Sequence, residues 1–285
     1  MSKIAIVTDS TAYIPKEIGA DFIFHVAPLQ LIWGDEQFRD GVDIQPDEFY
    51  ERLQTAEIMP STSQVTPGTF KEIYKDLSSQ GYEIFSIHIS SKLSGTIDSA
   101  IQAKEMLELQ NIEIFDSFTT GMALGFQVLT VARAVANGAS LKECVKIAQK
   151  ARENSGVLLT VKTLEFLHRG GRIGGAQAFL GTMLKLKPIL EVRGGKIEPA
   201  GKARTMNKAV EKMINILFEK IDHKSPVRLA IQHANARVEA ENLQSKVINA
   251  LGNVEIAEIM ISDVSPVIGT HIGPGVVGIS FLAGM

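Results

Sequence analysis

The sequence predicts an α/β fold with two domains: an N-terminal domain built on a parallel sheet, residues 1–155, and a C-terminal α+β domain, residues 156–285. A length of 285 residues is enough for two ordinary domains. In the first half, short β-branched runs alternate with helical patterns, as in βαβ units around a parallel sheet. After about Gly156 the strand patterns favour antiparallel pairing, so we place the boundary there.

The first half contains three strand patterns, "IAIVTD", "YEIFSIHIS" and "NIEIFDS", and each ends in small polar residues. The segment "TPGTFKEIYKDLSSQG" predicts a helix with one apolar face. Thr66 can cap this helix, Pro67 suits its first position, and Gly81 can end it. Residues 120–138 predict a long helix, and a second helix follows.

The start of that second helix has a capping box, because Ser140 is followed three residues later by Glu143. Between the first strand and the helix at Pro67, residues 22–45 predict a hairpin-like insertion, in which Asp40-Gly41 is a turn signal. In the second half, two strand patterns flank Gly194-Gly195 and predict an antiparallel pair. A helix and three further strand patterns complete the chain.

Composition excludes several classes of function. The chain has 29 Lys and Arg against 32 Asp and Glu, a net charge of -3, so no positive field favours nucleic acid. No apolar run approaches the ~18 residues of a membrane span. The N-terminal apolar run is too short for a signal peptide, and we expect a cytoplasmic protein with no integral membrane segment. The single cysteine, Cys144, lies in a helical pattern and is expected to pack in the core.

The motifs of autonomous catalysis are missing. "SSKLSGT" places Lys92 before its glycine, unlike a nucleotide-binding P-loop, and the turn after the first strand lacks the glycines of a dinucleotide fingerprint. No Cys/His cluster is present for a metal, and the histidines are dispersed. We therefore expect neither a metal nor a cofactor.

Hydroxyl groups gather at the ends of the predicted strands. They lie in "TDST", "SSKLSGT" and "DSFTTG", with "PSTSQVTP" just before another helix. In a parallel sheet these ends meet at one edge, where helix N-termini favour a small anion. The alternative is that each hydroxyl only caps a helix or closes a turn.

Four residues of the second half could also contribute to a site. His271 in "GTHIGPG" could donate a hydrogen bond to an anion or pack as a core imidazole. Arg169 and Arg172 in "LHRGGRIGG" and Arg204 in "GKARTMN" are cations in glycine-rich or polar stretches. Solvation at the surface is the alternative for each arginine.

Seven motifs together resemble the DegV family, whose members bind fatty acids and include the lipid-binding subunits of bacterial fatty acid kinase. They appear in the family's order along the whole chain: "IAIVTDSTAYIP", "PSTSQVTPGTF", "ISSKLSGTIDSA", "IFDSFTTGMALG", "LEFLHRGGRIGG", "GKIEPAGKART" and "VIGTHIGPGVVGISF". The resemblance implies a long-chain fatty acid bound between two domains. It implies that Thr62, Ser94, the backbone of Gly95 and His271 hold its carboxylate.

The resemblance also implies roles for the arginines and a partner. Arg204 matches an arginine implicated in phosphoryl transfer, and Arg169 and Arg172 lie in a segment expected to contact a partner or phosphate. The expected activity is that of a carrier, not an enzyme, which presents the carboxylate to a separate ATP-dependent kinase subunit. An autonomous phosphotransferase or phosphatase using His271 and Arg204, or an interaction module with incidental lipid, are the alternatives.

Overall fold

The computed structural model describes residues 3–20, 22–182 and 186–285, and it confirms the predicted α/β fold class. Its first sheet has four parallel strands in the order β2-β1-β6-β7. The strands are β1 (Lys3–Asp9), β2 (Phe24–Ala27), β6 (Tyr82–His88) and β7 (Ile112–Asp116). Successive residues of a strand point to opposite faces, so β1 sends Ala5 and Val7 to one core and Ile6 to another.

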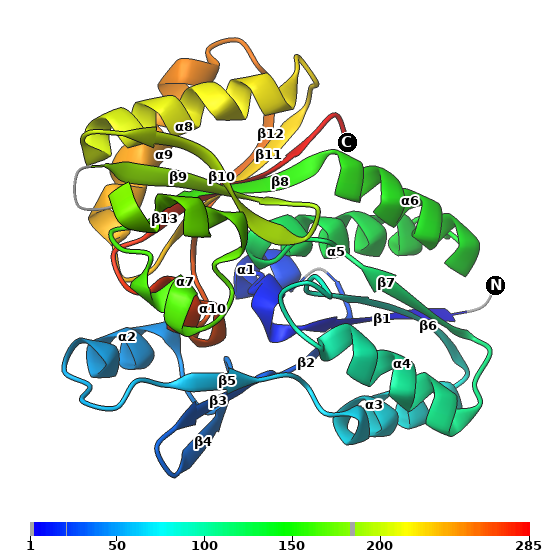
Figure 1. Cartoon of the computed structure of the whole chain (residues 1–285). Helices are drawn as coiled ribbons and strands as arrows, with labels where there is room; N and C mark the ends of the chain where they lie inside the picture. The colour runs from blue at the N-terminus through cyan, green and yellow to red at the C-terminus, as the bar shows by residue number, and fades with distance from the viewer. Residues whose placement is uncertain (1–2, 21, 183–185) are drawn as a thin grey trace.

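Helices cover both faces of this sheet, as Figure 1 shows. On one side lie α3 (Pro67–Ser79) and α4 (Thr96–Leu107); on the other lie α5 (Gly121–Ala136) and α6 (Leu141–Glu153). The predicted caps are confirmed: Thr66 accepts a hydrogen bond from the amide of Thr69, and Ser140 and Glu143 form a capping box. Cys144 is buried in the core, as predicted, and burial raises its pKa to about 11.

The second sheet has six strands in the order β10-β9-β8-β13-β11-β12. They are β8 (Ser155–Thr160), β9 (Lys187–Arg193), β10 (Lys196–Ala203), β11 (Val227–His233), β12 (Ile256–Asp263) and β13 (Val277–Ala283). Only the β11–β12 pair is parallel within this described sheet. The predicted antiparallel pair around Gly194-Gly195 is confirmed as β9 and β10.

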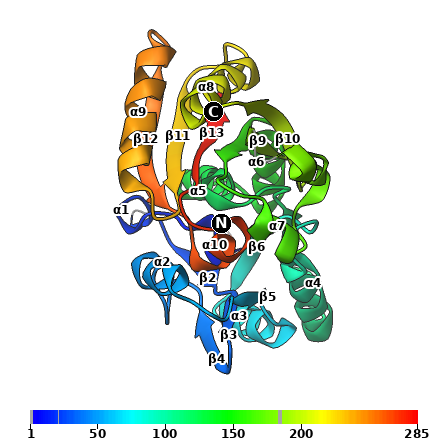
Figure 2. The same ribbon diagram turned by 60° about the vertical axis from the view of Figure 1, so that its left-hand side comes forward.

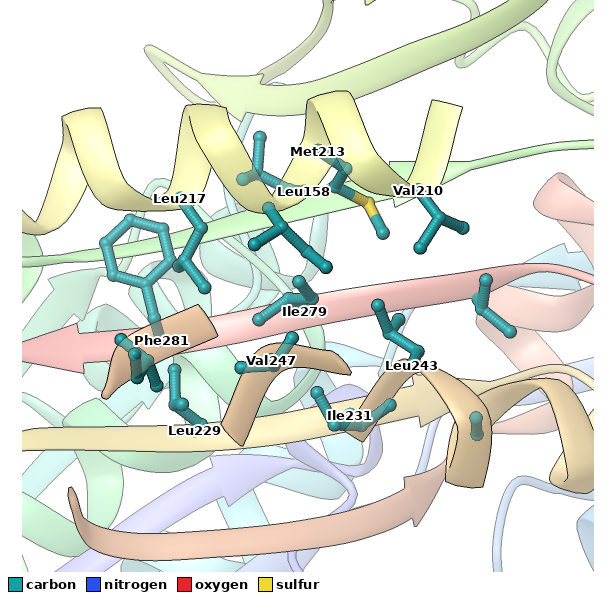
Figure 3. Packing of buried hydrophobic residues seen from close by; sticks show 14 of the residues in the cluster. Leu158, Val210, Met213, Leu217, Leu229, Ile231, Leu243, Val247, Ile279 and Phe281 are labelled. Carbon is teal, nitrogen blue, oxygen red and sulfur yellow. The ribbon is translucent and has the colours of Figure 1, made fainter. Parts of the chain in front are cut away.

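One face of this second sheet is covered by α8 (Met206–Ile221) and α9 (Arg237–Leu251). Figure 3 shows Met213 and Leu217 of α8 and Leu243 of α9 against Ile279 and Ile231 of the sheet. The other face packs against α5, which contacts both sheets and lies between them (Figures 1 and 2).

A small three-stranded sheet, in the order β4-β3-β5, extends from the first half. It consists of β3 (Gln30–Trp33), β4 (Glu36–Arg39) and β5 (Ser61–Ser63), with α2 (Pro46–Gln54) between β4 and β5. The hairpin insertion is therefore present, and Asp40-Gly41 lies in a turn after β4, in which the amides of Val42 and Asp43 donate to the carbonyl of Arg39. The hairpin turns at Gly34-Asp35, where Gly34 has a φ of 63°, a conformation that glycine adopts without strain. Asp40 is buried after β4.

Short elements complete the fold: η1 (Ser10–Ala12), α1 (Lys16–Gly19), α7 (Glu165–Arg169), η2 (Gly174–Thr182) and α10 (Pro266–Ile272). Helix α10 contacts α2, α7, β3 and β5, so the last part of the chain lies against the small sheet of the first half. None of the helices in the described residues is long and apolar enough to cross a membrane.

Candidate ligand-binding cavity

A mainly apolar cavity is lined by residues of both halves of the chain. The volume of this cavity is about 230 Å³. Its apolar lining residues include Leu29, Ile89, Leu159, Val192, Ile197 and Val264. About a third of the described lining residues have polar side chains, and Arg172 is the one charged residue among them. This combination of an apolar wall with a few polar groups is typical of sites for amphipathic small molecules.

Thr62 and His271 meet at this cavity although they lie 209 residues apart in the sequence. The Oγ1 atom of Thr62 is 2.8 Å from Nε2 of His271. Thr62 lies on β5, which is positioned by its pairing with β3, where Leu31 is the partner of Thr62. His271 lies on α10, whose N-terminus is capped by Ser265. The structure therefore brings together two of the residues that the family resemblance implied.

His271 is held in its neutral form. Burial, and then the positive charge of Arg172, lower the pKa of this imidazole to about 4. The Nδ1 atom has no hydrogen-bond partner among the described residues. A buried N–H without an acceptor is less favourable than a bare lone pair, so the geometry favours the Nε2–H tautomer. In that tautomer His271 donates to Thr62, and the Thr62 hydroxyl remains free to donate to a ligand.

Ser94 and Gly95 lie at the start of α4 and also line the cavity. The Oγ atom of Ser94 accepts a hydrogen bond from the amide of Thr96 at 3.3 Å. A side chain at position 95 would collide with Gln64, whose Nε2 donates to Ser99 at 2.8 Å. The absence of a side chain on Gly95 thus lets the "PSTSQVTP" segment lie directly against the start of α4.

The loop that carries Ser94 is fixed to the second half of the chain. Ser90 donates from Oγ to the carbonyl of Gly195 at 2.9 Å. Arg172 donates from Nε to the carbonyl of Leu93 at 3.1 Å, and its Nη1 donates to the carbonyl of Gly170 at 2.7 Å. Two contacts across the halves, both ending on backbone carbonyls, therefore position the loop.

The capping alternative is correct for the "TDST" loop. Asp9 caps η1 by accepting from the amide of Thr11, and it also accepts from the amide of Ile89. Ser10 accepts from the amide of Leu29. These side chains organise the edge of the sheet but do not line the cavity.

The three arginines differ in position. Arg172 is solvent-exposed yet lines the cavity, which places it at the opening. Arg169 is exposed and pairs with Glu165 at 2.6 Å. Arg204 is exposed between β10 and the α8 cap Thr205, outside the cavity lining, and makes no ion pair or hydrogen bond with the described residues. The structure thus brings Arg172 to the cavity and leaves the other two on the surface.

Six further polar or small residues line the cavity and were not predicted as site residues: Ser63, Gln64, Thr120, Gly121, Gln232 and Gly278. The first four lie inside segments already noted for their hydroxyl groups. Gln232 lies outside these segments, and its signal in the sequence is a polar amide side chain within the mainly apolar strand pattern of β11. Within the described residues, no group of three or more His, Cys, Asp or Glu side chains could hold a metal ion.

Known proteins resemble this chain over nearly its whole length. The chain matches the model of the DegV family of uncharacterised proteins over residues 3–284. Protein DegV of Bacillus subtilis is 37% identical over 277 residues, which cover 97% of this chain and 98% of the relative. A DegV domain-containing protein of Halalkalibacterium halodurans is 36% identical over 282 residues, or 99% of each chain.

Solved structures agree with these relatives. A DegV family protein from Thermus thermophilus, described for its fatty acid binding, superposes with a TM-score of 0.93 at 31% identity over 99% of both chains. DegV of Bacillus subtilis, described as a fatty acid binding protein, gives a TM-score of 0.88 at 36% identity, covering 99% of this chain and 100% of its own. On the family match and these relatives, this chain belongs to the DegV family.

Proposed function

We propose that this chain binds a long-chain fatty acid and presents its carboxylate to a separate ATP-dependent kinase subunit, which would phosphorylate it to an acyl phosphate. The observation that carries the proposal is the Thr62–His271 pair, a neutral hydrogen-bonding unit in a mainly apolar cavity. The related proteins from Thermus thermophilus and Bacillus subtilis are described as binding fatty acids. We place the carboxylate at Thr62, Ser94, Gly95 and His271.

The two ends of a fatty acid need different surroundings. Burial of roughly fifteen methylene groups at ~0.8 kcal/mol each favours binding of the tail by on the order of 12 kcal/mol before ordering costs. A carboxylate removed from water is unfavourable by several kcal/mol unless hydrogen-bond donors replace the water. The hydroxyls of Thr62 and Ser94 can supply such donors beside the apolar wall.

Neutral donors also suit transfer of a phosphoryl group. An arginine bound directly to the carboxylate would lower its nucleophilicity, whereas hydroxyl donors hold it and leave an oxygen able to attack the terminal phosphate of ATP. The two side-chain nitrogens of Arg172 named above already donate to backbone carbonyls. We assign Arg204, exposed on the surface, to the transferring phosphate, and Arg169 and Arg172 to contact with the partner or phosphate.

The alternative of autonomous phosphoryl transfer by His271 and Arg204 receives no support from the geometry. His271 lines the cavity, whereas Arg204 is exposed and does not. The neutral imidazole, with its lowered pKa, is suited to hydrogen bonding rather than to donating a proton at neutral pH. We therefore favour a carrier that depends on a partner for catalysis.

Mass spectrometry of lipid extracted from the purified chain tests the binding step, and we expect a long-chain fatty acid. The double variant Thr62→Val, Ser94→Ala should lose at least about tenfold in fatty acid affinity, because two donors to the carboxylate disappear. Retention of wild-type affinity by that variant would contradict the head-group assignment.

The transfer step needs a separate assay with ATP, fatty acid and a candidate kinase subunit. We expect acyl phosphate only when all components are present, and less product with Arg204→Ala at unchanged lipid occupancy. Acyl phosphate formed by the chain and ATP alone would favour the autonomous alternative. Full product with Arg204→Ala would remove that residue from the transfer step.

A further inference from the structure

A second group of polar atoms lines the same cavity, on elements that do not carry the residues assigned to the carboxylate. It consists of the side chains of Thr120, at the start of α5, and Gln232, on β11. In the described part of the chain, no hydrogen bond joins either side chain to Thr62, Ser94 or His271. The cavity therefore contains a second polar locus, carried by other elements than the residues assigned to the carboxylate.

Gln232 is 6% exposed, and its orientation is fixed by the hydrogen bonds of its oxygen. The Oε1 atom accepts from the amide of Met122 at 3.1 Å and from Oγ of Ser280 at 2.5 Å. The amide nitrogen makes no hydrogen bond to any described residue. A buried amide whose oxygen is occupied and whose nitrogen is not leaves two N–H donors available to whatever occupies the cavity.

Glycines provide the space beside this amide. A Cβ atom on Gly121 would lie 2.8 Å from Oε1 of Gln232, closer than such atoms approach, and 3.1 Å from its Nε2, a tight contact. On the neighbouring strand Gly278 is the direct partner of Gln232, and it also lines the cavity. The amide nitrogen of Gln232 is therefore not covered by side chains at either position.

Thr120 adds a hydroxyl to the same locus. Its Oγ1 atom is buried and has no hydrogen-bond partner among the described residues, and although Thr120 is the N-cap of α5 its side chain makes no capping bond. The N-terminus of a helix carries a partial positive charge, which attracts an oxygen atom. The hydroxyl, the free amide group and the helix terminus thus all favour a hydrogen-bond acceptor.

We propose that the acyl chain bound here carries a hydroxyl or keto group along its tail, and that the oxygen of this group accepts hydrogen bonds from Thr120 and Gln232. This inference rests on the proposed function. A plain hydrocarbon tail would leave both donors without partners, which is unfavourable in an apolar cavity. A second carboxylate fits less well than a neutral oxygen, since Arg172, the one charged lining residue, already donates to Leu93 and Gly170.

The test compares the wild-type chain for binding of a saturated long-chain fatty acid and of its monohydroxy derivatives, with the hydroxyl moved carbon by carbon along the tail. We expect one or two neighbouring positions to bind about tenfold or more tightly than the other hydroxylated acids, because only there does the hydroxyl reach both donors. The keto acid of the preferred position should bind comparably. Uniformly weaker binding of every hydroxylated acid overturns the inference.

Thr120→Val and Thr120→Ser provide the matched pair of variants. The hydroxyl of Thr120 bonds to no other described residue, so Thr120→Val should fold normally, and its affinities are compared with that for the plain acid in the same variant. Thr120→Val should reduce severalfold the affinity advantage of the acid with the preferred hydroxyl position over the other hydroxylated acids. Thr120→Ser should preserve this advantage. An advantage that persists undiminished in Thr120→Val contradicts the inference.

The plain acid separates this inference from the proposed function. If neither the plain acid nor any derivative binds, the proposed function itself fails. If the plain acid binds and no hydroxyl position is preferred, only the further inference fails. A crystal structure with the preferred acid should place its hydroxyl oxygen against Oγ1 of Thr120 and Nε2 of Gln232, and a water molecule at that place, with the hydroxyl elsewhere, would refute it.

Discussion

Gly170 lies directly against His271, at a position where a Cβ atom would collide with Nδ1 of the imidazole. Gly170→Ala should therefore displace His271 from Thr62 and reduce fatty acid affinity by roughly tenfold, the effect of losing about one hydrogen bond to the head group. The φ of Gly170 is -74°, so the backbone itself tolerates alanine. Isothermal titration with a long-chain fatty acid measures the change.

Gly181→Ala is the control for this prediction, because no atom of the described residues lies within 4 Å of the added Cβ. Its affinity should equal that of the wild-type chain. Unchanged affinity in Gly170→Ala would mean that His271 does not position the ligand through Thr62.

The lowered pKa of His271 predicts how binding and stability depend on pH. With a pKa of about 4 in the folded chain, the imidazole stays neutral at pH 5, and fatty acid affinity should lose no contribution from His271 between pH 7 and pH 5. Because the unfolded chain binds this proton more readily, the contribution of His271 to stability is present above pH 6.5 and is lost as the pH falls toward 4. The lost contribution is on the order of 3 kcal/mol.

Urea unfolding of the wild-type chain and of His271→Asn across this range measures that contribution. The wild-type chain should lose stability relative to the variant as the pH falls from 6.5 to 4. Parallel profiles for the two chains would show that His271 keeps its ordinary pKa in the folded state.

Asp40 should give a dependence of the opposite sign. Burial raises the pKa of this carboxyl group to about 7, Oδ1 accepts from the amide of Val267 at 3.4 Å, and Oδ2 has no partner among the described residues. The folded chain holds the proton more tightly than the unfolded chain does. The stabilising contribution is therefore complete below pH 3.8 and is lost as the pH rises toward 7, by on the order of 4 kcal/mol.

Asp40→Asn removes this titration and preserves the shape of the side chain. Measured by urea unfolding, the stability of the variant relative to the wild-type chain should rise between pH 4 and pH 7, because the wild-type carboxyl group becomes charged in a buried place. A constant difference between the two chains across that range would refute the raised pKa.

Arg172 offers a test of how the head-group loop is held. Arg172→Met removes the hydrogen bonds to the carbonyls of Leu93 and Gly170. Affinity for a fatty acid should fall severalfold, since the loop with Ser94 loses one of its contacts to the second half. The melting temperature should change little because the side chain is exposed.

Arg169→Met is the matched control, because Arg169 is also exposed but pairs with Glu165 and does not line the cavity. It should leave fatty acid affinity unchanged. Equal losses of affinity in the two variants would indicate a general effect of positive charge rather than a specific contact of Arg172.

Local signals in the sequence were sufficient to predict most of the fold. Thr66 and Ser140 define helix starts through bonds to Thr69 and Glu143, each three residues further on, and a sequence displays this spacing directly. Asp40-Gly41 and Gly34-Asp35 are both turn-forming pairs, and the sequence alone did not show that the second pair joins the two strands of the hairpin. Burial of Asp40 distinguishes them, and it depends on residues far away in the chain.

The site was predictable only in part for the same reason. The hydrogen bond of Thr62 with His271 joins positions 209 residues apart, which no local pattern could predict. The resemblance to a family implied only that both residues belong to one carboxylate site. Gln232 was missed because a polar residue in a buried strand does not reveal which cavity, if any, its side chain meets.

The two contacts that hold the loop of Ser94 have an evolutionary consequence. Ser90 and Arg172 donate to the carbonyl oxygens of Gly195 and Leu93, and every amino acid carries such an oxygen. Substitutions at position 93 during divergence would leave its contact chemically intact. Coupled changes between the donor and acceptor positions are therefore not expected, and statistical covariation among homologous sequences would overlook this link between the two halves.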